Sequence, residues 1–124
     1  MPDRPSDPSG TKRYLLDAAQ MKPLATGMGA CYATDRITVE GRKVGFMYRE
    51  ERDTDVDSGW RFTAGDESQD YMDDPDNLGV YDVNTIANYD PAIVPHLLSK
   101  EGSAYERNER TGRFEKVDFD PGDD

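Results

Sequence analysis

Hydrophobic and polar residues alternate in several short runs of this 124-residue chain, and a period of two predicts β-strands. The clearest run covers residues 60–64, where Trp60, Phe62 and Ala64 point to the same side. This spacing is typical of a strand in a sheet with one buried face. Similar runs predict further strands, of which the last two form a hairpin: 30–34, 37–39, 44–48, 103–109 and 112–117.

A helical spacing of apolar residues occurs in three other segments. The first covers residues 12–21. Asp82 is the predicted N-cap of a second helix over 83–89. Asp90 followed by Pro91 predicts the start of a third, because proline suits the first helical position. The apolar face of that helix comprises Ile93, Val94, Leu97 and Leu98, although Pro95 limits its regularity.

These elements predict one α+β domain, made mainly of an antiparallel sheet with short helices packed on one face. The segment 71–78 is acidic and interrupted by Pro75, so only a helical turn or a loop is expected there. The domain is expected to span residues 11–117. Residues 1–10 and 118–124 are rich in Pro, Asp and Gly, lack an apolar pattern, and are expected to be flexible.

Negative charge is concentrated in residues 50–76. This segment holds eleven acidic residues against two arginines, and therefore carries −9 of the chain's formal charge of −11. Such clustering costs self-repulsion and favours a cationic partner, whereas nucleic acid and anionic membrane surfaces would be repelled. The residues predicted to contact a partner are Asp53, Asp55, Asp57, Trp60, Asp66, Glu67, Asp70, Tyr71, Asp73, Asp74 and Asp76.

Catalysis is not predicted, and neither is a bound metal or cofactor. Only Cys31 and His96 could form a nucleophilic pair, and their local sequences lack a nucleophile motif. The loop that begins at Asp53 superficially resembles a calcium loop. However, Ser58 stands where that loop needs glycine and Ala64 where it needs glutamate.

The cysteine content and the apolar runs bear on where the protein acts. A single cysteine cannot form an internal disulfide, which favours a reducing cytoplasm. No apolar run approaches the roughly 20 residues of a membrane span, and no signal sequence opens the chain. Trp60 has two interpretations: it is either the core anchor of its strand or an aromatic anchor of an interface.

A similarity to a known family covers about residues 21–115. It is carried by five sequence blocks: ACYATDRIT, GRKVGFMYREE, DSGWRFTAGDES, YMDDPDNLGVYDVNTIANYDPAIVPHL and GSAYERNERTGRF. In this order they resemble the bacterial immunity protein 33 family. The resemblance implies a small cytosolic protein that is encoded near a toxin of interbacterial competition and neutralises it by binding. It carries over no binding residues.

The leading hypothesis is therefore an immunity protein that binds and neutralises a cognate antibacterial toxin through its acidic segment. A toxin that acts on phosphates would have a basic cleft, which these carboxylates would cover. Two alternatives stay open at this point. One is a housekeeping binding or regulatory module without a toxin partner, and the other is a metal-dependent hydrolase that uses the loop 53–57.

Overall fold

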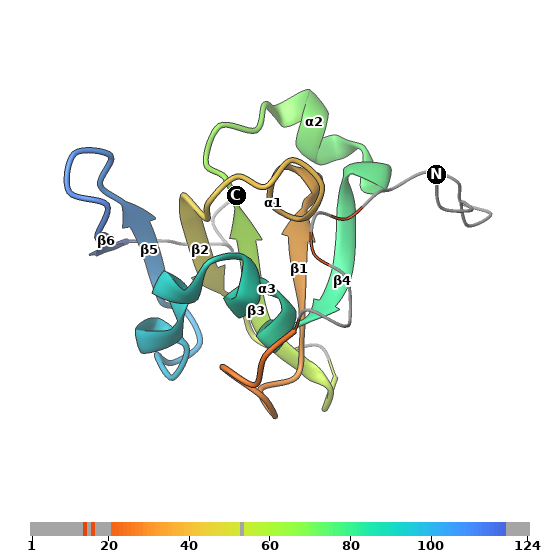
Figure 1. Ribbon diagram of the computed structural model, residues 1–124, viewed down its shortest axis with the longest axis vertical. Coiled ribbons are helices and arrows are strands. Elements are labelled where there is room, and N and C mark those ends of the chain that lie inside the picture. Colours follow the sequence, from red (N-terminus) through yellow and green to blue (C-terminus); the bar gives the residue numbers. More distant parts are fainter. Residues whose placement is uncertain (1–13, 15, 17–20, 53, 119–124) are drawn as a thin grey trace.

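The computed structural model describes residues 14, 16, 21–52 and 54–118, which build a six-stranded sheet (Figure 1). The strands are β1 Ala30–Thr34, β2 Phe46–Arg49, β3 Asp57–Thr63, β4 Leu78–Asp82, β5 Ala104–Arg107 and β6 Phe114–Val117. Their order across the sheet is β4-β1-β3-β2-β5-β6. Neighbours pair antiparallel except β1 and β3, which run parallel. The predicted α+β class with a mainly antiparallel sheet is confirmed.

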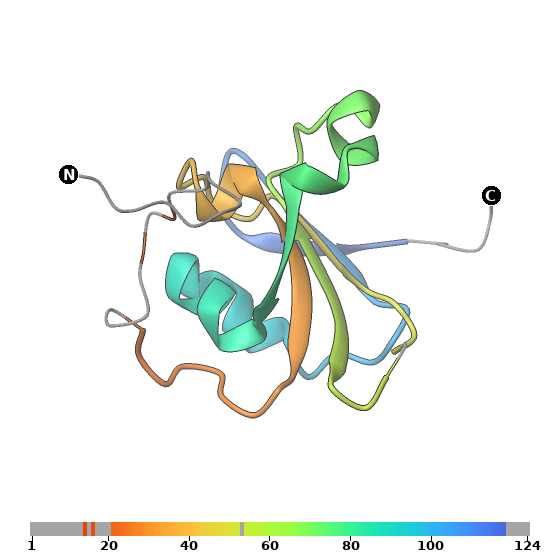
Figure 2. The same ribbon diagram turned by 90° about the vertical axis from the view of Figure 1, so that its right-hand side faces the viewer.

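The helices are short and lie mainly on one face of the sheet. They are α1 Asp35–Thr38, α2 Gln69–Asp73 and α3 Val83–Tyr89, with 3-10 helices η2 Pro75–Asn77 and η3 Pro91–His96. Figures 1 and 2 show α1, α3 and η3 on this face, whereas α2 stands at the upper end of the sheet and leans toward the other face. Among the described helices, none is both long and apolar enough to cross a membrane.

The face opposite α3 is called the open face here, and one row of side chains defines it. Tyr32 of β1 pairs with Val80 of β4 and with Arg61 of β3, and Arg61 pairs in turn with Tyr48 of β2. Residues directly opposite each other in neighbouring strands point to the same side of a sheet. Val80 is 62% exposed and Tyr32 41%, so apolar surface faces solvent at the β4 end of this row.

The hydrophobic core lies between the sheet and the helices α1, α3 and η3. Trp60 and Phe62 of β3 stack there with ring centroids 5.9 Å apart, so their predicted inward orientation is confirmed. Trp60 is fully buried, and its indole N–H donates to the Leu97 carbonyl at 3.1 Å. Such a bond satisfies the one polar atom of a buried tryptophan. The other fully buried members of this core include Ala33, Ile37, Val44, Met47, Val83, Ile86, Ala87 and Ile93.

Both predicted helix caps are present. Asp82 accepts a hydrogen bond from the Asn84 N–H and begins α3, and Asp90 accepts one from the Ala92 N–H and begins η3. The predicted regular helix after Asp90 is a 3-10 helix instead, because Pro95 in its interior removes a backbone donor. It ends at His96. Leu98 consequently lies outside the helix and is exposed instead of sharing its apolar face.

One local prediction is wrong, and another is incomplete. Residues 37–39 were expected to form a strand, but α1 covers Asp35–Thr38 because this turn brings Ile37 and Thr38 into the core, and burial overrides the strand preference of β-branched residues. The segment 71–78 was expected to contain a helical turn or a loop; α2 and η2 supply short helical turns there, while the strand β4, which begins at Leu78, was not expected. The helix predicted over 12–21 and both predicted flexible ends fall largely outside the described residues.

Candidate functional site

The acidic segment does not form one patch, because β3 runs through its middle. Glu50 and Asp55 lie before this strand, and Asp66 and the α2 aspartates follow it. Its seven residues include a bulge, so they advance by about four regular steps of 3.3 Å, roughly 13 Å in all. In Figure 1 the loop before β3 is at the lower end of the sheet and α2 is at the upper end. The predicted contact residues therefore separate into two groups.

β3 carries a buried ion-pair network on the open face. Arg61 Nη1 and Nη2 each donate to one carboxylate oxygen of Asp57 at 3.0 Å, and Arg61 Nε donates to Glu50 at 2.9 Å. The guanidinium also lies 4.6 Å from the centroid of the Tyr32 ring. The Arg61 and Asp57 side chains are only 8% and 12% exposed. Burial by itself disfavours the charged guanidinium, but the two carboxylates more than offset this and raise the pKa of Arg61.

A bulge in β3 brings Asp57 and Arg61 within reach of each other. Residues four apart in a regular strand are separated by about 13 Å. Here β1 advances two residues, from Ala30 to Tyr32, while β3 uses four. Gly59 lies in this bulge with φ +88°, where an added Cβ would be 2.3 Å from a neighbouring backbone oxygen. Only glycine fits there, so the bulge that builds the ion pair depends on Gly59.

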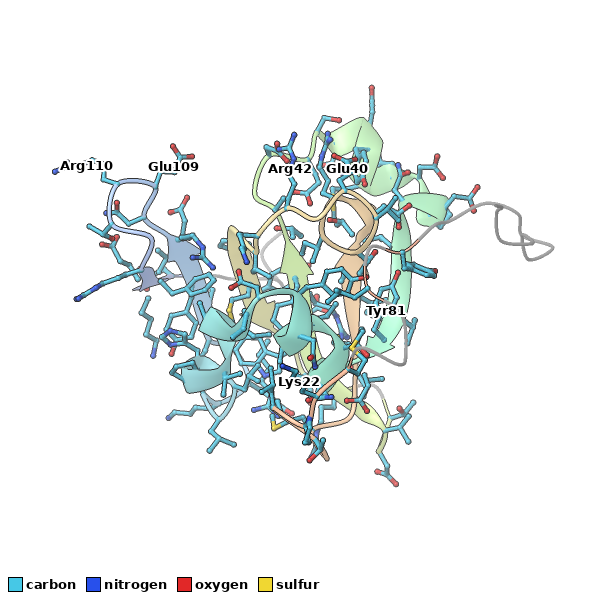
Figure 3. The ribbon with its side chains drawn as sticks, in the orientation of Figure 1. Lys22, Glu40, Arg42, Tyr81, Glu109 and Arg110 are labelled. Atoms are coloured by element: carbon cyan, nitrogen blue, oxygen red, sulfur yellow. The ribbon has the colours of Figure 1, made fainter. Side chains whose placement is uncertain are left out.

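Asp66 and Glu67 hold the upper end of β3 in place. Asp66 forms ion pairs with Arg36 of α1, at 3.3 Å, and with Arg42, which Figure 3 labels near the upper end of the sheet. Glu67 accepts hydrogen bonds from two backbone N–H groups of the turn after β3, at 2.8 and 2.9 Å. It also accepts one from the Thr34 hydroxyl at 2.6 Å. Both carboxylates are thus engaged within the domain.

The remaining acids of the upper group face solvent. Within the described residues, no lysine or arginine forms an ion pair with any of them. Ser68 caps α2 and Asp74 caps η2, so local hydrogen bonds fix the backbone that carries them. We call this surface the α2 acidic edge, and it consists of Asp70, Asp73, Asp74 and Asp76.

Tyr71 fastens α2 to the rest of the domain. Its ring lies under the Arg36 guanidinium, 4.7 Å from centroid to Cζ, and its carbonyl accepts a hydrogen bond from Asn77 at 3.0 Å. Burial of the hydroxyl raises its pKa. Tyr71 is therefore a positioning residue for the α2 acidic edge, rather than the exposed aromatic that a partner would contact first.

The other predicted contact residues have different positions. Asp55 is exposed in the loop between β2 and β3, and Asp53 lies outside the described residues. Trp60 is fully buried in the core, so a partner could reach it only if β3 came apart. Trp60 is therefore a core anchor of β3, and the proposed contact surface does not include it.

Sequence reasoning missed a hollow of about 270 Å³ between α2 and the open face. Its lining draws on α2 and four strands or their ends, and these residues are spread over more than 40 positions of the chain. The only local signal was the alternation that places Phe46 and Tyr48 opposite the buried Met47. Burial, and secondarily the charge of Glu50, raises the pKa of Tyr48. The lining includes Tyr32, Tyr48, Glu50, Arg61, Met72 and Leu78.

Cys31 and His96 lie in separate parts of the domain, in β1 and at the end of η3. Cys31 is on β1, whereas His96 packs against Tyr105 of β5 and Phe114 of β6. Three strand spacings separate β1 from β5, which is about 14 Å. Burial lowers the pKa of His96. Among the described residues, no three His, Cys, Asp or Glu side chains gather as a metal site would require.

Cys31 is expected to react much more slowly with a disulfide reagent such as DTNB in the native protein than in urea. Burial, with a smaller contribution from Asp82, raises the pKa of its thiol, so little thiolate forms at neutral pH. The rate of labelling is measured from the absorbance of the thionitrobenzoate that DTNB releases. Rapid native labelling would contradict the buried position of this cysteine.

A comparison with known families places the chain in one of them. The family model described as "Immunity protein Imm33 domain" matches residues 31–118. No curated protein and no solved structure matches the chain significantly. The matched range contains β1 from its second residue, the other five strands in full, the Arg61 network and the α2 acidic edge. Since this match covers well over half of the sequence, the chain belongs to the Imm33 immunity protein domain family.

Proposed function

We propose that this protein binds a cognate antibacterial toxin and neutralises it without catalysis, using the α2 acidic edge as its main contact. Membership of an immunity protein family supports this class of function. One observation carries the choice of surface: four exposed aspartates within residues 70–76, with no paired lysine or arginine among the described residues. The place of action would be the reducing cytoplasm, where a single cysteine stays reduced.

The α2 acidic edge projects a field that the ion-paired carboxylates Glu50, Asp57 and Asp66 do not. Asp57 and Glu50 share Arg61, and Asp66 is paired with two arginines, so much of their charge is balanced within the domain. An unbalanced field attracts a basic cleft from a distance and raises the association rate. Because Tyr71 and the local caps already hold α2, little ordering would be needed on binding.

Reversing three charges of this edge, in the variant Asp70→Lys, Asp73→Lys, Asp76→Lys, is expected to slow association with the toxin encoded beside this gene. A loss of about 10–100-fold at low salt is within the range of electrostatic steering. The difference should shrink at about 0.5 M salt, because screening shortens the range of the field. Biolayer interferometry over a series of salt concentrations measures both effects.

A matched control reverses Glu109, Glu115 and Asp118 at the far edge of the sheet, where Figure 3 labels Glu109. Each reversal adds two charges, so both triple variants move the formal net charge from −11 to −5. Equal slowing in the two variants would assign the effect to net charge and reject the α2 acidic edge. A wild-type protein that neither binds this toxin nor protects cells expressing it would contradict the proposed function itself.

A further inference from the structure

The hollow beside the α2 acidic edge has the size and lining of a site for one long side chain. Its volume of about 270 Å³ lies just below the roughly 300–1,000 Å³ of sites for whole small ligands. Tyr32 and Tyr48 provide aromatic surface from the sheet, while Met72 of α2 and Leu78 at the start of β4 provide aliphatic surface. Most of this lining suits a stem of methylene groups.

The charge in this hollow is negative. Arg61 is the only lysine or arginine of its described lining, and it is shared by Glu50 and Asp57, so the three groups together carry −1. The Glu50 side chain is 39% exposed, so its carboxylate can still be approached from solvent. An aromatic and aliphatic hollow with an accessible carboxylate favours a side chain that is apolar along its length and positive at its tip.

We propose that the toxin inserts an arginine side chain of a basic segment into this hollow. The inference rests on the proposed function and names the chemistry of the partner. The methylene stem would pack against Met72 and Leu78, and the guanidinium would stack on Tyr48 and bond to Glu50. The chain's own Arg61 already makes the equivalent pair of contacts, with the Tyr32 ring and with Glu50.

Arginine fits these walls better than the two obvious alternatives. A lysine ammonium is more strongly hydrated and lacks the planar group that stacks on a ring. A purely apolar side chain would cover the Glu50 carboxylate without offering it a partner, which is costly. The field of the adjacent α2 acidic edge also favours a positive group.

A peptide with a single arginine tests this inference. It avoids the non-specific binding that a polycation would show to any acidic protein. The full chain, with methyl-labelled methionines, is titrated with capped Gly-Gly-Arg-Gly-Gly and with counterparts carrying lysine or norleucine. The Met72 methyl resonance is expected to shift saturably with the arginine peptide, while Met28, which packs against the core, stays unmoved. The lysine peptide should bind more weakly, and the norleucine peptide should leave Met72 unchanged.

Substitutions in the lining of the hollow test which side chains bind the peptide. Tyr48→Leu is expected to lower the affinity for the arginine peptide about 2–10-fold, because one cation–π contact is lost. Tyr48→Phe keeps the aromatic ring and should keep the affinity. Glu50→Gln should lower the affinity for the arginine peptide about tenfold, which is the scale of one charge-assisted hydrogen bond. The matched change Glu109→Gln should leave this affinity unchanged. Urea midpoints of all variants show whether the fold is intact.

Measurements of toxin binding distinguish a failure of this inference from a failure of the proposed function. Tyr48→Leu should raise the dissociation rate of the toxin while its association rate stays unchanged. Equal shifts with the norleucine peptide, or no shift of Met72 with any peptide, would overturn the arginine site. A toxin complex slowed by reversal of the α2 acidic edge but indifferent to Tyr48→Leu would do so too, and would leave the proposed function standing. If the protein binds the arginine peptide but not the toxin, the proposed function fails and the hollow loses its toxin assignment.

Discussion

Replacing Arg61 by methionine is expected to lower the free energy of unfolding by about 3–5 kcal/mol, because this removes one partner of a buried ion pair. Arg61 and Asp57 are both almost inaccessible to solvent, and two parallel hydrogen bonds join them. Without the guanidinium, the Asp57 carboxylate would remain in the same confined position with its main counter-charge gone. A domain of this size has a total stability of only about 5–15 kcal/mol, so much of it would be lost.

Urea unfolding followed by far-ultraviolet circular dichroism measures this loss. The double variant Arg61→Met, Asp57→Asn should recover most of it, since a neutral pair leaves no uncompensated charge. The control is Arg52→Met, which removes an exposed arginine paired with Glu101 and should cost less than about 1 kcal/mol. If Arg61→Met and Arg52→Met unfolded at the same midpoint, the network would contribute nothing and its assignment as scaffold would be wrong.

Trp60→Ala is expected to cost about 3–5 kcal/mol as well, through a cavity in the core and not through a lost surface contact. The indole is fully buried, stacks on Phe62 and donates a hydrogen bond to the Leu97 carbonyl. Removing it leaves a void between β3 and the helices and leaves that carbonyl without its donor. Equilibrium unfolding in urea measures this change directly.

The milder variant Trp60→Phe distinguishes stability from binding. It keeps most of the apolar volume, so the domain should stay folded with a smaller loss of stability. Toxin affinity should then equal that of the wild type, because Trp60 does not reach the surface. A folded Trp60→Phe protein with strongly reduced affinity would restore the interpretation of this residue as an interface anchor.

The elements that could be predicted are those whose cause is local. Asp82 and Asp90 begin their helices because each side chain caps a backbone N–H two residues later. Trp60 and Phe62 are buried because a period of two fits a sheet that is covered on one face. The strand predicted over residues 37–39 was wrong because the apolar pattern of only three residues fits a strand and a helical turn equally well. β4 was missed because its glycine and its exposed Val80 weaken the strand pattern.

The site was less predictable, because distance along the chain does not measure distance in the fold. The acidic segment is continuous in sequence, yet β3 divides it, and the Gly59 bulge brings Asp57 to Arg61 on the open face. Nothing local shows that a carboxylate in this segment is already neutralised. The hollow depends on strand order, since Tyr32 and Tyr48 become neighbours of Arg61 only when β3 lies between β1 and β2.

The division of the acidic segment by β3 has a consequence for how partner specificity can diverge. The α2 acidic edge and the Asp55 loop lie beyond opposite ends of β3, which is roughly 13 Å long, so they are farther apart than the about 7–10 Å within which substitutions usually influence one another. Their contributions to affinity should therefore add. If both ends contact the toxin, as the proposed function allows, a lineage could alter one end to match a changed toxin while the other end keeps the complex together. Discrimination between related toxins would then accumulate stepwise, without passing through a protein that binds none of them.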